Sequence, residues 1–131
     1  MRKSLLLILV AAFIVTLFTV SCSKKKDEPA SQKTYSELIV GRWKTESEQP
    51  YHEVYYSDGT GKFWDEADDV TEDESTTFDW SIDSNNKLTQ IHHMQEGQGD
   101  LPQYCNILTL NETTFKYNNE GWRAEYTLYR E

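Results

Sequence analysis

Histidine is the residue type in this sequence that most readily suggests a metal site. His92 and His93 are adjacent, and His52 lies in an earlier β-rich segment. Zinc binds imidazole nitrogens, but neighbouring residues of a strand point to opposite faces of a sheet. We therefore expect surface or cross-strand histidines, and we predict no metal site and no cofactor.

An acidic segment at residues 65–74 (DEADDVTEDE) holds seven carboxylates in ten positions. Calcium takes oxygen ligands, but the segment lacks the Asp-x-Asp-x-Asp-Gly spacing with its turning glycine. The density of like charge predicts a mobile, self-repelling loop. Adventitious calcium binding and docking of a basic protein stay open as alternatives.

Sequence signatures of catalysis are absent from the chain. There is no Gly-x-Ser-x-Gly, no phosphate-binding loop and no zinc motif. Carboxylates are abundant, but no spacing selects one Asp/Glu pair for acid–base chemistry. We therefore predict that the protein is not an enzyme.

Aromatic residues are the remaining candidates for ligand contact. Aromatic side chains bury large areas in cores, and a subset that lines an open barrel mouth could hold an apolar or sugar ligand. Four of them fall on alternating positions that we expect to face the inside of a sheet. The predicted ligand-binding residues are Phe78, Trp80, Tyr104 and Tyr126, with core packing as the alternative.

From Gly41 onward the pattern predicts short β-strands separated by turns. Residues 76–83 (TTFDWSID) show this best, because Phe78, Trp80 and Ile82 alternate with polar residues. The expected strands are 42–48, 51–57, 62–65, 76–83, 87–94, 104–110, 114–117 and 122–130, with a loop at 95–101 and a helical turn at 35–40.

About eight strands joined by short turns should pair in antiparallel order with their sequence neighbours. An open meander of this kind leaves two exposed edges, and closure into an up-and-down barrel removes them. We therefore predict an all-β fold: an antiparallel up-and-down meander closed into a small barrel, with the short N-terminal helical turn at one end.

A family resemblance adds to this prediction. Gly41-Arg42-Trp43 resembles the Gly-x-Trp motif that opens the first strand of lipocalins, and Arg130 stands where that family places an arginine across the tryptophan. Residues 35–131 look like the small lipocalin-like domains of bacterial envelope lipoproteins. The resemblance implies a barrel closed at one end by Gly41, Trp43 and Arg130, through a cation–π contact.

The N-terminus resembles a lipoprotein signal peptide. Arg2 and Lys3 precede an uncharged run at residues 5–20, which is short for a spanning helix and fits a signal-peptide core. Residues 19–22 (TVSC) are similar to the lipobox of bacterial lipoproteins, which implies cleavage before Cys22 and lipidation of its thiol. A plain signal peptide and an uncleaved anchor are the alternatives.

Residues 23–33 (SKKKDEPASQK) contain no hydrophobic side chain larger than Ala, which predicts a flexible tether. Lys-Asp-Glu after Cys22 is similar to a signal that exports lipoproteins to the outer face of the outer membrane; contact of the lysines with anionic headgroups is the alternative. We therefore predict anchoring to the outer membrane through Cys22, with exposure at the cell surface as a further expectation. The predicted parts are the signal peptide 1–21, the acylated cysteine and tether 22–34, and the barrel domain 35–131.

Removal of residues 1–21 leaves 11 basic and 22 acidic residues, a net charge of −11. Such acidity argues against nucleic acid as a partner and suits a cationic one, although solvated acidic loops alone would explain it. If Cys22 is acylated, Cys105 has no partner for an internal disulfide. We expect Cys105 to be buried as a small hydrophobe.

Two functions follow from these features. The first is a non-enzymatic envelope lipoprotein that binds a small apolar molecule inside a lipocalin-like barrel. The second is a filled barrel that acts as an interaction or inhibitor module for a cationic protein, such as a lysozyme, through its acidic surface. We predict the first function, by analogy at the level of the fold, and keep the second as the alternative.

Overall fold

The computed structural model describes residues 31–131 apart from Glu96, so the signal peptide 1–21 and the lipidation site Cys22 lie outside the described residues. Gln32–Glu131 form one compact unit. Its elements are the helix α1 (Tyr35–Ile39), the 3₁₀ turns η1 (Glu66–Asp68) and η2 (Glu72–Glu74), and the strands β1 (Gly41–Lys44), β2 (Tyr51–Tyr55), β3 (Thr60–Asp65), β4 (Thr76–Ile82), β5 (Lys87–His93), β6 (Asp100–Leu110), β7 (Thr114–Asn119) and β8 (Ala124–Arg130).

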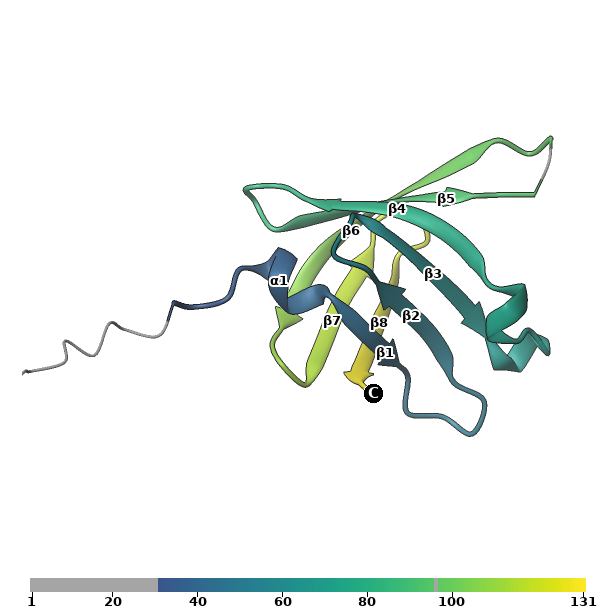
Figure 1. Ribbon diagram of the computed structural model, residues 1–131, viewed down its shortest axis with the longest axis horizontal. Helices are drawn as coiled ribbons and strands as arrows, with labels where there is room; N and C mark the ends of the chain where they lie inside the picture. The colour runs from purple at the N-terminus through teal and green to yellow at the C-terminus, as the bar shows by residue number, and fades with distance from the viewer. Residues whose placement is uncertain (1–30, 96) are drawn as a thin grey trace, which may run out of the picture. The chain divides into compact units, whose positions relative to one another are not determined.

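The eight strands form a closed barrel (Figure 1). Each strand pairs antiparallel with the next, and β8 pairs antiparallel with β1 at Trp43 opposite Arg130. The predicted up-and-down β-barrel with a short N-terminal helix is therefore confirmed. The closed ladder and the core lie within Gln32–Glu131, so this segment contains what it needs to fold on its own.

Helix α1 is a single capped turn that lies against the barrel. Thr34 and Glu37 form a capping box, in which each side chain bonds the other residue's backbone N–H. Ile39 is fully buried, and its carbonyl oxygen accepts a hydrogen bond of 2.7 Å from Trp43 Nε1. The described residues contain no helix with the length and apolar character required to cross a membrane.

Gly41, Trp43 and Arg130 close the barrel at the end where α1 lies. The guanidinium of Arg130 is 4.0 Å from the centroid of the Trp43 ring, and it donates to the backbone carbonyls of Leu38 and Val40. Gly41 has φ of +140°, and a Cβ there would overlap Arg130 Nη1. The close approach of the arginine therefore requires glycine at this position.

The core consists of alternate side chains from every strand. On β4, Phe78, Trp80 and Ile82 point inward while Asp79 and Ser81 are exposed, as predicted. The buried core residues are Ile39, Trp43, Tyr55, Phe78, Leu88, Cys105, Leu110, Phe115, Tyr117 and Leu128. The predicted burial of Cys105 is confirmed.

Strand β6 is longer than predicted. It starts at Asp100, whereas the alternation in the sequence indicated a start at Tyr104. Its first residues pair only with β5, and the pairing with β7 begins at Cys105. Pro102 therefore lies on a free edge, where a missing backbone N–H is tolerated.

Candidate functional site

Three of the four aromatic residues predicted to bind a ligand face the barrel interior. Phe78 is buried, and its ring centroid is 5.2 Å from that of Tyr55. Trp80 and Tyr126 are partly buried against the core, and Tyr126 stacks on Tyr117 with centroids 5.1 Å apart. All three side chains therefore pack in or against the hydrophobic core.

The inward orientation predicted for Tyr104 is wrong. Tyr104 pairs with Thr89 on the outer face of β5 and β6, and it is 48% exposed. Its ring lies 5.7 Å from Lys87 Nζ. The inward positions on this part of β6 belong to Gln103 and Cys105, because side chains alternate along a strand.

Glu53 lies in the barrel interior. Its carboxylate is fully buried and accepts hydrogen bonds from the hydroxyl groups of Tyr51 (2.9 Å), Tyr55 (2.6 Å) and Tyr117. Burial raises the pKa of Glu53, and the three hydroxyl groups oppose that rise. Sequence analysis missed this cluster, although Tyr51, Glu53 and Tyr55 alternate along β2 and must therefore share one face.

A polar network extends from Glu53 along the interior. Gln90 Nε2 donates to the Tyr55 hydroxyl over 2.6 Å, and Gln90 Oε1 lies 3.0 Å from His92 Nε2. In a separate buried pair, Gln103 Oε1 accepts from Asn119 Nδ2 at 2.7 Å. Burial lowers the pKa of His92 to about 4, so the imidazole is neutral near neutral pH.

The described part of this interior holds a hydrophobic core and a hydrogen-bonded polar network. No buried polar side-chain atom of the described residues lacks a hydrogen-bond partner. Several pockets of the described chain are lined mainly by loop residues and outward-facing strand residues, and two of them also reach Tyr55 or Trp80, which pack against the core. The barrel centre, with a buried carboxylate and three phenols, therefore differs from an empty apolar cavity.

One pocket of the described chain lies outside the barrel, and we call it the Trp64 pocket. It has a volume of about 510 Å³, within the range of small-molecule sites. It lies between the outer face of β1–β3 and the connection from β3 to β4. Its lining residues are Arg42, Gln49, His52, Trp64, Glu66, Asp69, Val70, Thr71 and Glu72.

His52 and Trp64 form one wall of this pocket. They are directly opposite on β2 and β3, and their rings stack with centroids 4.4 Å apart and planes 9° apart. His52 Nδ1 lies 2.7 Å from a carboxylate oxygen of Glu131, and His52 Nε2 lies 2.9 Å from one of Glu66. These contacts on both ring nitrogens fix the imidazole in place.

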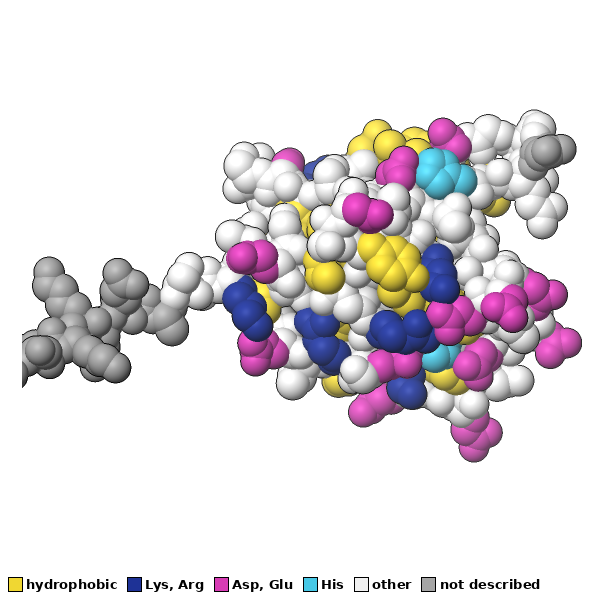
Figure 2. All heavy atoms as spheres, viewed as in Figure 1, with side chains coloured by type: hydrophobic (Ala, Val, Ile, Leu, Met, Phe, Trp, Pro, Cys, Tyr) yellow, Lys and Arg dark blue, Asp and Glu magenta, His cyan; other side chains and the backbone are white. Residues whose placement is uncertain are grey.

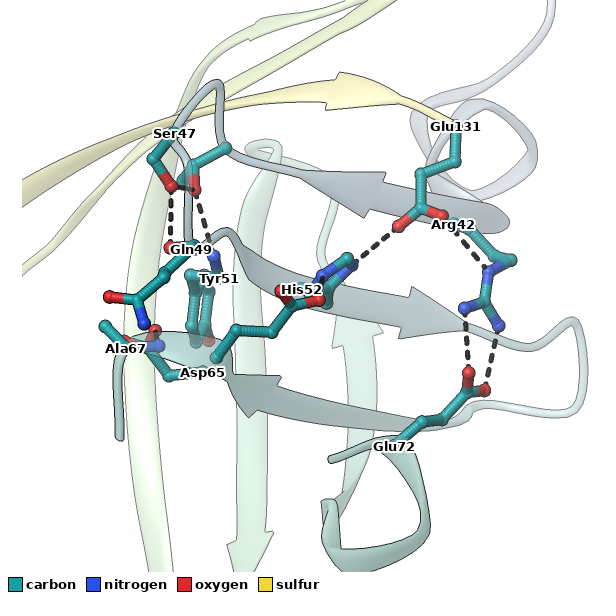
Figure 3. A network of polar contacts seen from close by, with 11 residues as sticks. Arg42, Ser47, Gln49, Tyr51, His52, Asp65, Ala67, Glu72 and Glu131 are labelled. Carbon is teal, nitrogen blue, oxygen red and sulfur yellow. Dashed lines mark hydrogen bonds and ion pairs between the residues drawn. The ribbon is translucent and has the colours of Figure 1, made fainter. Parts of the chain in front are cut away.

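Arg42 and Glu72 form the other wall. Arg42 donates two hydrogen bonds to Glu72, of 2.9 and 3.0 Å, and its Nε lies 3.6 Å from Glu131 (Figure 3). Lys62 Nζ is 2.7 Å from Glu72. The two cations lower the pKa of Glu72 to about 2, and the same carboxylate raises the pKa of Arg42.

The acidic segment 65–74, for which a mobile loop was predicted, contains the last residue of β3 and the turns η1 and η2. Asp65 accepts from the backbone N–H of Ala67, and Thr71 and Glu74 form a capping box. Within the described chain, Asp68, Asp69 and Asp73 form none of the ion pairs. Figure 2 shows acidic side chains gathered over this connection.

The three histidines lie at separate sites. His92 is buried inside the barrel, and His93 lies on the outer face beside Asp79 and Asp100, as their adjacent positions on a strand predict. Those two carboxylates raise the pKa of His93. Residues 31–95 and 97–131 contain no group of three or more His, Cys, Asp or Glu side chains arranged to hold a metal ion.

Comparison with protein-family models finds no matching family, and comparisons with curated proteins and with solved structures find no match either. The functional argument therefore rests on the fold and on the site geometry described above.

Proposed function

We propose that this protein is a non-enzymatic envelope lipoprotein whose filled barrel presents a binding face to a cationic protein. The binding face consists of the connection 66–75 between β3 and β4, together with the neighbouring Trp64 pocket. The lipid anchor is Cys22, which lies outside the described residues, and the proposed location is the outer membrane with the barrel exposed at the cell surface.

The occupied barrel centre carries this proposal. Glu53 and its three tyrosine partners form a buried polar cluster inside the barrel, which supports a filled barrel over an apolar carrier cavity. The Trp64 pocket lies on the outer surface and is lined by Asp69, which like Asp68 and Asp73 of the same connection forms none of the ion pairs of the described chain. A surface of this sign attracts cationic partners and speeds their association.

A binding assay with a lysozyme as the cationic probe tests this function. We expect Gln32–Glu131 to bind lysozyme and the affinity to fall as salt screens the charges. The double variant Asp68→Asn/Asp73→Asn should bind about tenfold more weakly. The matched control is Glu112→Gln/Glu125→Gln, which removes the same charge elsewhere on the barrel.

Equal losses in the two double variants would show an effect of net charge alone and would contradict a defined binding face. Absence of lysozyme binding at low salt would contradict the proposed function with this partner.

Binding of a small molecule among the partly buried aromatic side chains of the barrel is the second candidate. Three aromatic side chains are partly buried there, namely Tyr51, Phe63 and Tyr126. The ring centroid of Tyr51 lies 6.0 Å from that of Phe63 and 5.8 Å from that of Tyr126. Aromatic walls of this kind suit a flat apolar or sugar ligand. Native mass spectrometry of the protein isolated from its envelope tests it, because a bound ligand would add a defined mass and an unliganded mass would contradict it.

A further inference from the structure

We infer that His52 is a proton-dependent latch, which holds the start of the connection 66–75 on the barrel and releases it when the imidazole ring loses a proton. The latch would regulate the binding face proposed above, and in that respect the inference rests on the proposed function. The contacts of His52, the burial of its ring and the exposure of the connection carry it.

The two nitrogens of the His52 ring each lie next to a carboxylate. Nδ1 is 2.7 Å from Glu131 Oε1 (Figure 3), and Nε2 is 2.9 Å from Glu66 Oε1. An ionised carboxylate only accepts hydrogen bonds, and a neutral imidazole carries a single N–H. His52 therefore forms both hydrogen bonds only as the imidazolium cation, which has an N–H on each nitrogen.

Charged side chains of several neighbouring elements surround the ring. They are Arg42 and Lys44 of β1, Glu66, Asp69 and Glu72 of the connection, and Glu131 after β8. The neighbour on β3 is the uncharged ring of Trp64. Among these residue types, histidine alone ordinarily changes its charge between pH 5 and 8. The His52 ring is therefore the group through which pH acts on these contacts.

Loss of the proton breaks the contact of His52 with Glu66 and leaves the contact with Glu131. Glu131 is held by a further bond, because its backbone N–H donates to the Arg42 carbonyl at 3.0 Å, and its side chain is only 23% exposed. The Glu66 side chain is 46% exposed and is free to turn into solvent. A neutral His52 therefore keeps its N–H on Nδ1, and the lone pair on Nε2 repels the Glu66 carboxylate.

The connection 66–75 is otherwise held lightly. None of its residues is buried, and segments with few buried contacts open locally at a low cost in free energy. At its start, the backbone N–H of Glu66 donates to the Pro50 carbonyl over 3.2 Å. Farther along, Glu72 pairs with Arg42. Loss of the latch therefore frees the η1 part, while Glu72 keeps the η2 part in place.

The closed connection lies over side chains on the outer face of the sheet. His52 and Trp64 are only 6% and 5% exposed, although they alternate with Glu53 and Phe63, which face the core. Both line the same pocket as residues of the connection. Release of η1 should therefore expose the Trp64 ring and free the Glu66 carboxylate, which increases the negative charge of the binding face.

NMR of Gln32–Glu131 tests the latch without a partner. The ¹⁵N shifts of the His52 ring should show an N–H on both nitrogens at pH 5.5 and on Nδ1 alone at pH 8. The backbone N–H groups of Ala67, Asp69 and Val70 report on η1, because they bond to residues 65 and 66. We expect their protection from hydrogen exchange, corrected for the intrinsic effect of pH, to fall about tenfold over this range.

Two variants make the matched comparison. Glu66→Gln replaces the carboxylate with an amide, which accepts from a protonated ring or donates to a neutral one, so the η1 protection should change by less than about twofold with pH. Asp68→Asn removes the same charge from the same exposed turn. Asp68 forms no ion pair within the described chain, so this variant should keep the wild-type change.

Three results would overturn the inference. The first is a His52 ring whose protonation is the same at pH 5.5 and pH 8. The second is an η1 protection that does not change with pH in the wild type. The third is loss of the pH effect in Asp68→Asn as well as in Glu66→Gln, because the effect would then follow from charge alone.

Lysozyme binding at the two pH values separates the latch from the proposed function. Because release frees Glu66, the gain in affinity from pH 5.5 to pH 8 should be larger in the wild type than in Glu66→Gln. If η1 opens with pH but lysozyme binds at neither pH, the latch is supported and the proposed function fails with this partner. If lysozyme binds and η1 stays protected, the proposed function is supported and the latch is overturned. Equal gains in the two proteins would overturn the regulatory role of the latch.

Discussion

The guanidinium carbon of Arg130 lies 4.0 Å from the centroid of the Trp43 ring, across the seam where the last strand meets the first. The same guanidinium donates to the backbone carbonyls of Leu38 and Val40, just before β1. One side chain therefore connects both ends of the domain.

The first prediction concerns Arg130→Lys. Lysine keeps the charge but loses the planar group with several donors, so we expect the free energy of unfolding to fall by about 1–3 kcal/mol. Urea denaturation followed by tryptophan fluorescence measures it. Arg123→Lys, at an exposed turn, is the control and should change stability by less than about 0.5 kcal/mol. An equal effect in both variants would contradict a special role for Arg130.

Gly41→Ala tests the closeness of that seam. The alanine Cβ would overlap Arg130 Nη1, and φ of +140° is unfavourable for any residue with a side chain. We expect a loss of about 1–3 kcal/mol in the free energy of unfolding. Gly121→Ala meets its nearest atom at 3.4 Å and is not at positive φ, so it should be tolerated. A neutral Gly41→Ala would show that the arginine can move away without cost.

Glu53→Gln should change how stability depends on pH. Because burial raises the pKa of Glu53 above 4.5, the folded state binds its proton more tightly than the unfolded state. That contribution to stability is complete below pH 4.5 and is lost as pH rises through the folded pKa. We expect the variant to be about 1–3 kcal/mol less stable than wild type at pH 4, with the difference shrinking toward pH 8.

Urea denaturation of the wild type and Glu53→Gln at pH 4, 6 and 8 gives this comparison. Glu48→Gln, an exposed glutamate in the β1–β2 loop, is the control. A constant difference between wild type and Glu53→Gln across this range would contradict the raised pKa of Glu53.

His92 should affect the pH dependence of stability in the opposite direction to Glu53, and His92→Gln tests this. Burial lowers the pKa of His92 from 6.5 to about 4, so its neutral form contributes stability above pH 6.5 that is lost as pH falls toward 4. The free energy of unfolding of the wild type should therefore fall by about 2–3 kcal/mol more than that of the variant between pH 6.5 and pH 4. The pKa of His93 is raised, so His93→Gln should not reduce the loss of stability at low pH as His92→Gln does. Parallel pH profiles for wild type and His92→Gln would refute the assignment.

Cys105 should be unreactive in the folded protein. Burial raises the pKa of its thiol to about 12, and the thiolate is the reactive form. We expect modification by a disulfide reagent at pH 8 to be at least about a thousandfold slower in native Gln32–Glu131 than in urea. Rapid labelling under native conditions would mean that the core opens readily around β6.

The sequence by itself predicted the strand number, the antiparallel order and the closure of the barrel. It did so because local alternation and turn residues are encoded by neighbours along the chain, as in residues 76–83, where Phe78 and Trp80 share a face. It also placed Trp43 beside Arg130 through a family resemblance. Strand ends were less predictable. Strand β6 starts at Asp100 and not at Tyr104, because its first residues continue the pairing with β5 alone.

Only the tertiary structure decided what fills the barrel and where the open pocket lies. Glu53 belongs to a strand that sequence alone does not orient, and its three tyrosine partners come from β2 and from the distant strand β7. Trp64 forms a wall of the outer pocket because it stacks on His52 and because the loop that carries Asp69 lines the same pocket. Contacts between residues far apart in the chain depend on strand register and loop geometry, and composition and local periodicity do not encode these.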